Sequence, residues 1–187
     1  MRYTAEQESF VAMRITVFGV GYVGLVTGTC LAEMGNDVLC VDIDTDKIAR
    51  LQAGESPIYE AGLDDLLARN LREGRLQFGT DAAAGIEHGD IVFCAVGTPP
   101  DSEGRANLGQ VLAVAREFGK YSTRFQLLVN KSTVPVGTAQ RCREVVAAEL
   151  RSRGADHDFA VVSNPEFLRE GAAINDTMKP ERIVIGA

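Results

Sequence analysis

Short apolar runs alternate with longer amphipathic stretches along most of this chain. Runs of strand length, rich in β-branched residues, occupy 14–18, 37–41, 76–78, 91–96, 126–130 and 159–162. The stretches between them have helical length and period, which predicts helices at 23–34, 46–52, 63–73, 108–118 and 138–153. A last apolar run at 182–185 is expected to add an edge strand.

This alternation of strands and helices predicts the fold class. Strands that are apolar on both faces and joined by helical crossovers are typical of a parallel sheet covered on both sides. We therefore expect an α/β fold of the Rossmann type, a doubly wound parallel sheet with helices on both faces, over residues 13–187. Residues 1–12 lack the apolar core of a secretion signal, and we expect them to form a flexible N-terminal extension.

The composition narrows the class of ligand. The chain has 187 residues, 45% of them hydrophobic, and a net charge of -7 with a pI near 4.9. An acidic protein is poorly suited to nucleic acid or to an anionic membrane, and no apolar run approaches the ~18–20 residues that span a bilayer. We therefore expect a small-molecule ligand, with no nucleic acid and no membrane as partner.

The cysteines and the acidic runs give no sign of a disulfide or a metal site. The four cysteines are scattered without a CxxC pair, as is typical of free thiols in a reducing cytoplasm. The run DIDTDK is similar to the start of a calcium loop, but Lys47 stands where glycine is needed and Ala53 where glutamate is needed. We expect no metal and a cytoplasmic location.

The stretch GVGYVG has GxGxxG spacing directly after the first strand and at the start of the first helix, which is typical of dinucleotide binding. Gly19 would make the tight turn, Gly21 would let the backbone approach a pyrophosphate, and Gly24 would let helix and sheet pack closely. Free N–H groups at the helix start suit the anion. The cofactor-binding residues expected here are Gly19, Val20, Gly21, Tyr22, Val23 and Gly24.

An acidic residue, Asp42, follows these glycines by about 20 residues, at the end of the second strand. Its carboxylate can accept hydrogen bonds from both ribose hydroxyls and would repel a 2′-phosphate, so the sequence favours NAD over NADP. Lys47 lies one helical turn further on. It either reaches the adenosine ribose or phosphate or is a solvated surface lysine, and its spacing does not decide between the two.

Two further motifs follow strands. AVGTPP ends the fourth strand, and strand ends beside the switch point of such a sheet line the ligand crevice. Val96, Gly97 and Thr98 should therefore face the dinucleotide, unless the motif is an ordinary turn. NKSTVPVGT follows the fifth strand and places the hydroxyl of Thr133 at the mouth of the crevice, where it either contacts the ligand or caps the next helix.

The stretch SNPEFLREGAA carries two glutamates, Glu166 and Glu170, four residues apart. In a helix they would share one face and repel each other by roughly 0.2–0.5 kcal/mol. A helix capped by Asn164, with Pro165 in its first turn, would put Glu166 at the positive end of the helix dipole. This accounts for Glu166 but not for Glu170, so a functional role stays open beside the structural one.

Taken together and in order, these motifs carry a resemblance. FGVGYVG, VDID with Lys47, SPIYEAGL, VGTPP, KSTVPVGT and SNPEFLREGAA, followed by ERIVIG, resemble the N-terminal NAD-binding domain of the UDP-glucose/GDP-mannose dehydrogenase family over residues 13–187. The resemblance implies that the chain is the N-terminal part of a longer dehydrogenase, without the central helix and C-terminal domain. KSTVPVGT and EFLREGAA are more similar to the UDP-glucose branch, and GDP-mannose or UDP-N-acetylmannosamine dehydrogenase are the alternatives.

The resemblance also implies roles for single residues. Thr133 and Glu166 are expected to be catalytic and to position a water together, and Glu170 is expected near the nicotinamide end of NAD. The substrate-binding residues implied are Glu166, Phe167, Leu168 and Arg169, whose backbone would face the sugar nucleotide. In the full-length enzyme the resemblance implies a homodimer or a higher oligomer.

The reaction implied by the resemblance oxidises the C6 alcohol of UDP-glucose to the carboxylate of UDP-glucuronate, in two hydride transfers to two NAD. The family captures the aldehyde on a cysteine, which lies beyond the region matched here. None of the four cysteines, Cys30, Cys40, Cys94 and Cys142, stands in for it, so we expect the chain to be inactive alone. A hypothesis of another class is a stand-alone NAD-binding or oligomerisation module without catalysis.

Overall fold

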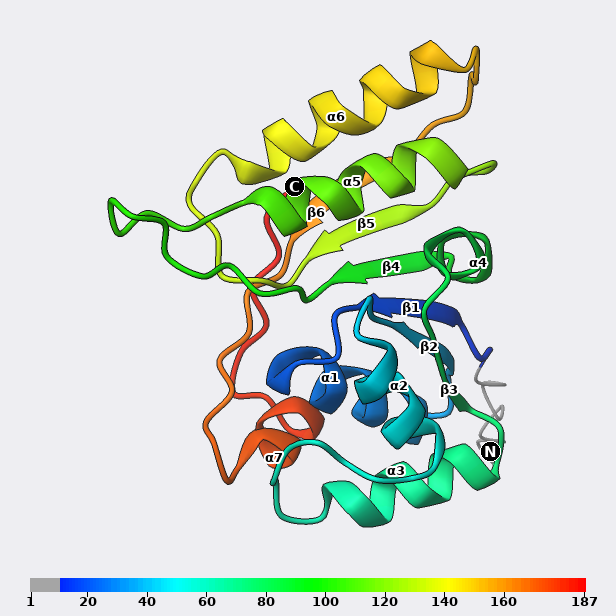
Figure 1. Ribbon diagram of the computed structural model, residues 1–187, viewed down its shortest axis with the longest axis vertical. Coiled ribbons are helices and arrows are strands. Elements are labelled where there is room, and N and C mark those ends of the chain that lie inside the picture. Colours follow the sequence, from blue (N-terminus) through cyan, green and yellow to red (C-terminus); the bar gives the residue numbers. More distant parts are fainter. Residues whose placement is uncertain (1–10) are drawn as a thin grey trace, which may run out of the picture.

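The computed structural model describes residues 11–187 (Figure 1). The extension expected at 1–12 lies outside the described residues, except for 11 and 12, which are in no helix or strand. The strands are β1 (Arg14–Phe18), β2 (Asp37–Val41), β3 (Leu76–Gly79), β4 (Ile91–Cys94), β5 (Leu127–Asn130) and β6 (Ala160–Ser163). The helices are α1 (Tyr22–Glu33), α2 (Thr45–Gln52), α3 (Leu63–Arg72), α4 (Ala82–His88), α5 (Gly109–Tyr121), α6 (Thr138–Ser152) and α7 (Ala173–Met178).

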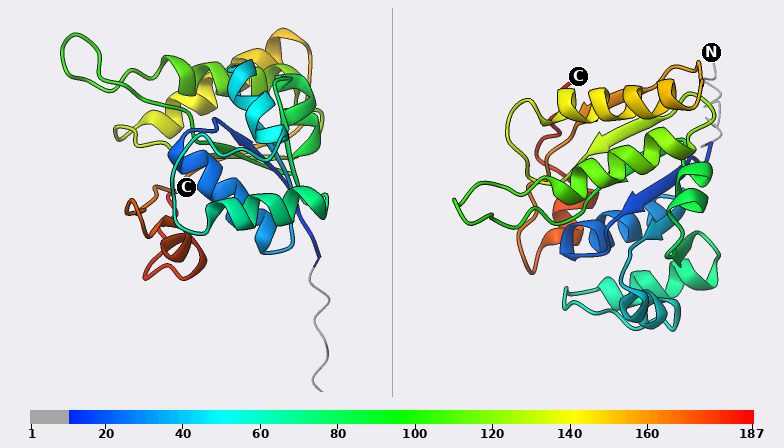
Figure 2. Two further views of the ribbon diagram at one scale, coloured as in Figure 1. Left: turned by 60° about the horizontal axis from the view of Figure 1, so that its bottom comes forward. Right: turned by 45° about the horizontal axis from the view of Figure 1, so that its top comes forward.

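The strands form one parallel sheet in the order β3-β2-β1-β4-β5-β6. This is the order of a doubly wound Rossmann sheet, with its switch point between β1 and β4. Helices α1, α2, α3 and α7 cover one face, and α4, α5 and α6 cover the other (Figures 1 and 2). The predicted fold class is confirmed.

The three central strands, β1, β2 and β4, send alternate side chains into two separate cores. Ile15 and Val17 of β1 pack in the core under α1 and α3, whereas Phe18 packs in the core under α4, α5 and α6. Burial of one such side chain contributes about 1.5–3 kcal/mol, so both faces hold the sheet. The carboxyl ends of the strands are thereby fixed relative to one another, which is what positions the loops of the site.

Two short helices were not predicted. Helix α4 begins where the Asp81 carboxylate accepts hydrogen bonds from the backbone of Ala83 and Ala84, at 2.8 and 3.2 Å. Its seven residues, AAAGIEH, are too few to show a helical period. Helix α7 is shorter still, with six residues, and begins at Ala173, which is fully buried. Short helices of this kind depend on packing against the rest of the fold rather than on local propensity.

The helix expected to begin at Asn164 and Pro165 is wrong. Residues 164–169 form an irregular loop, so Glu166 and Glu170 do not share a helical face. The backbone nitrogen of Asn164 continues the sheet by donating to the carbonyl of Asn130 at 2.9 Å. The Asn164 side chain donates from Nδ2 to the carbonyl of Val184 at 2.9 Å, and its Oδ1, the atom that would cap a helix, accepts from Lys131 Nζ at 3.2 Å instead.

The edge strand expected at 182–185 is also wrong. Residues 182–185 are in no strand, and the chain meets the sheet just beyond them in an antiparallel bridge, in which Ser163 and Gly186 exchange backbone hydrogen bonds of 2.7 and 2.8 Å. Arg182 instead places its guanidinium 4.5 Å from the ring centre of Phe167. Contacts to the 164–169 loop therefore replace the ladder of a strand. Within residues 11–187, every helix is too short or too polar to cross a bilayer.

Candidate functional site

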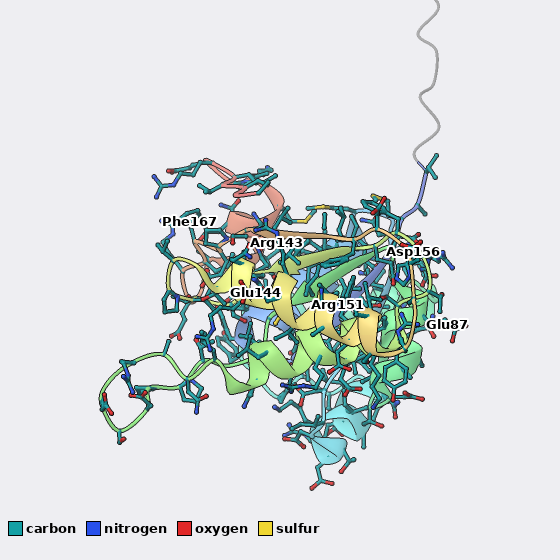
Figure 3. The ribbon with its side chains drawn as sticks, turned by 90° about the horizontal axis from the view of Figure 1, so that it is seen from above. Glu87, Arg143, Glu144, Arg151, Asp156 and Phe167 are labelled. Atoms are coloured by element: carbon teal, nitrogen blue, oxygen red, sulfur yellow. The ribbon has the colours of Figure 1, made fainter. Side chains whose placement is uncertain are left out.

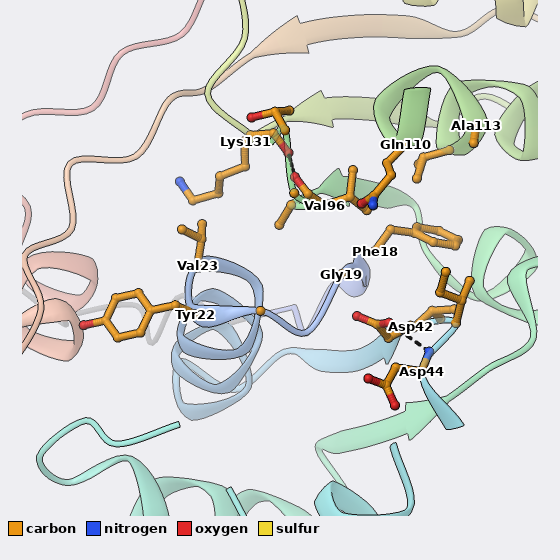
Figure 4. Close-up of a pocket in the computed structure, with 18 of the residues that line it drawn as sticks. Phe18, Gly19, Tyr22, Val23, Asp42, Asp44, Val96, Gln110, Ala113 and Lys131 are labelled. Carbon is orange, nitrogen blue, oxygen red and sulfur yellow. Dashed lines mark hydrogen bonds between the residues drawn. The ribbon is translucent and has the colours of Figure 1, made fainter. Parts of the chain in front are cut away.

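A cavity of about 660 Å³ opens at the carboxyl ends of the strands (Figure 4). It lies beside the switch point, where open α/β sheets bind their ligands. Of the residues predicted for cofactor, substrate or catalysis, its lining includes Gly19, Gly21, Tyr22, Val23, Asp42, Lys47, Val96, Gly97, Thr98, Thr133 and Glu166. Val20 and Gly24 lie behind this lining and shape it.

The glycine loop after β1 needs its glycines for different reasons. Gly19 has a φ of +95°, and a Cβ there would lie 2.7 Å from the carbonyl oxygen of Ala95. A Cβ on Gly24 would lie 1.9 Å from the carbonyl oxygen of Gly19, so the first turn of α1 sits directly on the loop. A Cβ on Gly21 would meet no atom within 4 Å, which leaves room for a phosphate to approach the backbone.

Asp42, at the end of β2, holds the glycine loop. Its Oδ2 accepts the backbone N–H of Val20 at 2.8 Å, and its Oδ1 accepts the N–H of Asp44 at 3.0 Å (Figure 4). Each carboxylate oxygen has a second lone pair. Since Asp42 also lines the cavity, those lone pairs suit the two ribose hydroxyls of a dinucleotide. The residues present thus fit NAD.

Lys47 lines the same end of the cavity from helix α2. Its Nζ lies 3.6 Å from the carboxylate of Asp44, whose pKa is held below its usual range mainly by the backbone N–H of Lys47. The lysine is therefore neither fully solvated nor free of a partner in the protein. Contact of Lys47 with the adenosine ribose or phosphate stays a prediction, and the alternative of a fully solvated surface lysine does not fit this pairing.

The opposite wall comes from the loops after β4 and β5. The hydroxyl of Thr98 donates to the carbonyl oxygen of Thr133 at 2.9 Å, and the hydroxyl of Ser132 donates to that of Val96 at 2.7 Å. These bonds tie the two loops together across the crevice. Ser132 was missed in the sequence, although it stands in the same motif as Thr133. Apolar lining residues were missed as well: Phe18, Ile43, Ala82, Ala113 and Val114.

A second cavity of about 500 Å³ adjoins the first. The four predicted substrate residues, Glu166 to Arg169, line it together with Thr27, Leu31, Phe93, Asp176 and Arg182. Figure 3 shows Phe167 at the opposite end of the molecule from Asp156, which follows α6, and from Glu87, which lies in the last turn of α4. Arg169 is held by Asp176 in an ion pair of 2.7 Å.

Lys131 and Glu166 line both cavities, and we call them the shared wall. Lys131 donates from its Nζ to the side-chain oxygen of Asn164 at 3.2 Å. Burial lowers the pKa of Lys131, although the charge of Glu166 acts in the opposite direction. The sequence analysis missed Lys131. Its position directly after β5, in the motif KSTVPVGT, was the available signal.

The two residues expected to be catalytic, Thr133 and Glu166, line the same cavity. No hydrogen bond joins Thr133 and Glu166 in the described part of the chain, and the Glu166 carboxylate accepts the backbone N–H of Leu168 at 2.5 Å. Glu170 is exposed in the turn before α7 and lines neither cavity. The structure therefore gathers the predicted residues at one edge of the sheet, except for Glu170.

Comparison with known proteins identifies this arrangement. A family model described as UDP-glucose/GDP-mannose dehydrogenase family, NAD binding domain, matches residues 13–187. The UDP-glucose 6-dehydrogenase of Pseudomonas aeruginosa is 49% identical over 175 residues, which are 94% of this chain and 39% of that protein. TuaD of Bacillus subtilis, also a UDP-glucose 6-dehydrogenase, is 50% identical over 93% of this chain and 37% of its own. The GDP-mannose 6-dehydrogenase of Pseudomonas putida is 40% identical.

Comparison with solved structures points to the same family. A UDP-glucose dehydrogenase from Pyrobaculum islandicum superposes with a TM-score of 0.88 at 42% identity, over 98% of this chain and 42% of that one. A GDP-mannose dehydrogenase from Pseudomonas aeruginosa, solved as a ternary complex, gives 0.85 at 39% identity, over 93% and 41%. This chain thus spans about two fifths of the length of its relatives. It belongs to the UDP-glucose/GDP-mannose dehydrogenase family, and residues 13–187 are the NAD-binding domain of that family.

Proposed function

We propose that this chain is the cofactor-binding part of an NAD-dependent UDP-glucose 6-dehydrogenase, which oxidises UDP-glucose to UDP-glucuronate. The observation that carries the proposal is the pair of adjoining cavities with Lys131 and Glu166 as their shared wall. A dinucleotide in one cavity and a sugar nucleotide in the other would meet at this wall. The identity to UDP-glucose 6-dehydrogenases, higher than to the GDP-mannose enzyme, supports UDP-glucose as the substrate.

The residues of this chain would bind and orient the cofactor. Asp42 would hold the adenosine ribose, and the N–H groups at the start of α1, beside Gly21, would hold the pyrophosphate. When bound, NAD supplies the acceptor for the hydride. Thr133 and Glu166 would hold a water at the mouth of the cavity, and Glu170 beside the nicotinamide remains a prediction.

The covalent step needs a nucleophile that this chain does not offer. The four cysteines are free and buried. Burial raises the pKa of Cys40 and of Cys94 to about 12, so neither thiolate is accessible at neutral pH. We propose that the nucleophilic cysteine is supplied by another part of a longer enzyme. Oligomer formation by that enzyme and a reducing cytoplasm as its location are further proposals, the second supported by the unpaired thiols.

Calorimetric titration of this chain with NAD, NADP, UDP-glucose and GDP-mannose tests the proposal. We expect NAD to bind well ahead of NADP, and UDP-glucose to bind weakly but ahead of GDP-mannose. Equal affinities for NAD and NADP would contradict the role of Asp42. Steady NADH production from UDP-glucose by the chain alone would contradict the need for a second part. If the chain binds NAD but no longer gene product has dehydrogenase activity, a stand-alone NAD-binding module is favoured.

A further inference from the structure

Glu60 is a buried carboxylate in the loop between α2 and α3, outside every residue set assigned above. Only 5% of Glu60 is exposed. Its Oε2 accepts the hydroxyl of Tyr22 at 2.5 Å and the backbone N–H of Gly171 at 2.8 Å. Its Oε1 accepts the N–H of Ala173 at 2.9 Å. One side chain thus gathers three donors from two distant segments.

The two segments belong to the two cavities. Tyr22 is the first residue of α1 and lines the dinucleotide cavity. Gly171 and Ala173 close the segment that begins with Glu166 and lines the second cavity. The Tyr22 hydroxyl also lies 3.5 Å from the carbonyl oxygen of Arg169, in the same segment. Glu60 therefore joins the start of the cofactor helix to the far end of the substrate segment.

At neutral pH, Glu60 is ionised and Tyr22 is protonated, which suits the hydrogen bonds between them and to Gly171 and Ala173. Burial, reinforced by the hydrogen bond to Glu60, raises the pKa of Tyr22 to about 12, so the phenol keeps its proton. The Tyr22 hydroxyl, together with the N–H groups of Gly171 and Ala173, holds the pKa of Glu60 below its usual range. A charged acceptor with several neutral donors is a strong arrangement, because hydrogen bonds to ionised groups are roughly twice as strong as neutral ones.

Upstream of Gly171 the substrate segment is tied to α7, because the Asp176 carboxylate accepts the backbone N–H of Arg169 at 3.0 Å and its guanidinium at 2.7 Å. At the turn itself, the hydrogen bond that holds the Gly171 N–H within the described residues is the one to Glu60. Gly171 is exposed and has a φ of +83°, and a Cβ there would meet no atom within 4 Å, so this turn is not packed in place. Helix α7, which follows, is anchored in the core by Ala173, Ile174 and Met178. Loss of Glu60 would leave α7 packed but would release the turn before it.

We propose that Glu60 is a positioning residue, which fixes the segment 166–171 against helix α1 so that the two cavities keep one relative geometry. The inference rests on the proposed function, since that geometry matters only if cofactor and substrate react across the shared wall. Glu60 touches neither cavity's expected ligand, and it acts through Tyr22 and the backbone of Gly171.

Amide hydrogen exchange of the whole chain, read by NMR, tests the link. In Glu60→Ala we expect exchange at Gly171 and Ala173 to be at least tenfold faster than in the parent, with exchange in β1 and β4 unchanged. Glu60→Gln, which keeps one acceptor oxygen, should restore part of the protection. The control is Glu55→Gln, which changes an exposed carboxylate earlier in the same loop, paired at 3.7 Å with Arg50.

Tyr22→Phe provides a milder variant if Glu60→Ala fails to fold, since it removes one donor and leaves the carboxylate in place. Faster exchange at Gly171 in this variant supports the link. Unchanged exchange at Gly171 and Ala173 in all variants, or an increase spread evenly over the sheet, would overturn it.

A second experiment separates this inference from the proposed function. On adding NAD to the parent, we expect exchange at Gly171 to slow further, and we expect no slowing in Glu60→Ala. If NAD does not bind the parent, the proposed function fails, while the exchange comparison without NAD still decides whether Glu60 holds the segment. If NAD binds and slows exchange equally in parent and variant, the positioning role is refuted although the function stands.

Discussion

The Oδ2 atom of Asp42 lies 2.8 Å from the backbone nitrogen of Val20 and accepts its hydrogen bond. The two residues come from motifs that the sequence separates, the acidic end of β2 and the glycine loop after β1. One carboxylate therefore shapes the loop that would hold the pyrophosphate and also lines the cavity where a ribose would lie. Selection of the cofactor would then depend on the same side chain that holds the conformation of the loop.

Replacing Asp42 should weaken cofactor selection. In Asp42→Ala we expect NAD to bind about tenfold more weakly, because hydrogen bonds to a charged group are worth about 1.5–3 kcal/mol and 1.4 kcal/mol is a factor of ten. NADP should lose less affinity, since the charge that repels its 2′-phosphate is gone. Calorimetry with both cofactors gives the ratio. The exposed Asp46→Asn serves as control, and an unchanged NAD to NADP ratio in Asp42→Ala would refute the assignment.

Replacing Gly21 or Gly24 by alanine should have different effects on stability and on NAD binding. Gly21→Ala should cost less than about 1 kcal/mol of unfolding free energy, because its Cβ meets open space and its φ of -70° suits alanine. NAD affinity should nevertheless fall at least tenfold, since the methyl group occupies space that the phosphate needs. Urea unfolding and calorimetry measure the two effects.

Gly24→Ala should lower the stability of the fold rather than act directly on NAD binding. Its Cβ would lie 1.9 Å from the carbonyl oxygen of Gly19, so we expect a loss of about 3 kcal/mol in unfolding free energy. Any weakening of NAD binding should then follow from the lost fold. A Gly24→Ala protein as stable as the parent would contradict the close packing described here.

The link between Glu60 and Tyr22 should make stability depend on pH at both extremes. The pKa of Glu60 is lower in the folded chain than in the unfolded chain, where it is about 4.3. The contribution of Glu60 to the free energy of unfolding is therefore fully present above about pH 4.3 and is lost as the pH falls through the folded-state pKa. Because the pKa of Tyr22 is raised from 10.0 to about 12, its contribution is present below pH 10.0 and is lost as pH rises through about 12.

Urea unfolding of the parent and of Glu60→Gln between pH 3 and pH 8 isolates the acid limb. We expect a difference of about 1–3 kcal/mol near neutral pH that shrinks toward pH 3. The comparison is needed because the pKa values of Glu33 and Asp90 are also lowered, although burial opposes this in both. Glu33 accepts hydrogen bonds from Asn70 and Arg69, and Asp90 accepts them from Arg14 and Arg124. A difference that stays constant with pH would mean that ionisation of Glu60 is not involved.

None of the four thiols should react in the folded chain. Each cysteine is at most 1% exposed, and burial raises the pKa of Cys30 to about 11 and those of Cys40 and Cys94 to about 12. A colorimetric disulfide reagent at pH 8 should label no thiol within minutes, and all four in urea. Val136→Cys, at a fully exposed position, is the positive control. Rapid labelling of one native thiol would reopen the question of a nucleophile in this chain.

The sheet and the glycine loop were predictable because local patterns encode them. Apolar runs bounded by turns mark β1 to β6, and Gly19, Gly21 and Gly24 carry their spacing in the sequence itself. The non-helical course of 164–169 was not predictable in this way. It depends on hydrogen bonds from Asn164 to Asn130 and Val184, which lie far along the chain.

The same reason explains why neither Glu60 nor Lys131 was predicted. Glu60 has partners 38, 111 and 113 residues away, so no local window contains the arrangement. Lys131 stands in the motif KSTVPVGT, but its contact with Asn164, 33 residues further on, forms only when the loops after β5 and β6 meet. By contrast, Asp42 was predicted because its distance from the glycines follows from one βαβ unit.

The shared wall has a thermodynamic consequence. Lys131 and Glu166 line both cavities. A charged ligand in one cavity would therefore change the electrostatic free energy of binding in the other. Thermodynamic linkage makes this effect reciprocal. If a bound dinucleotide changes the dissociation constant of the sugar nucleotide by some factor, a bound sugar nucleotide changes the dissociation constant of the dinucleotide by the same factor. The two occupants would therefore behave as heterotropic effectors of each other, with a coupling constant set by two side chains.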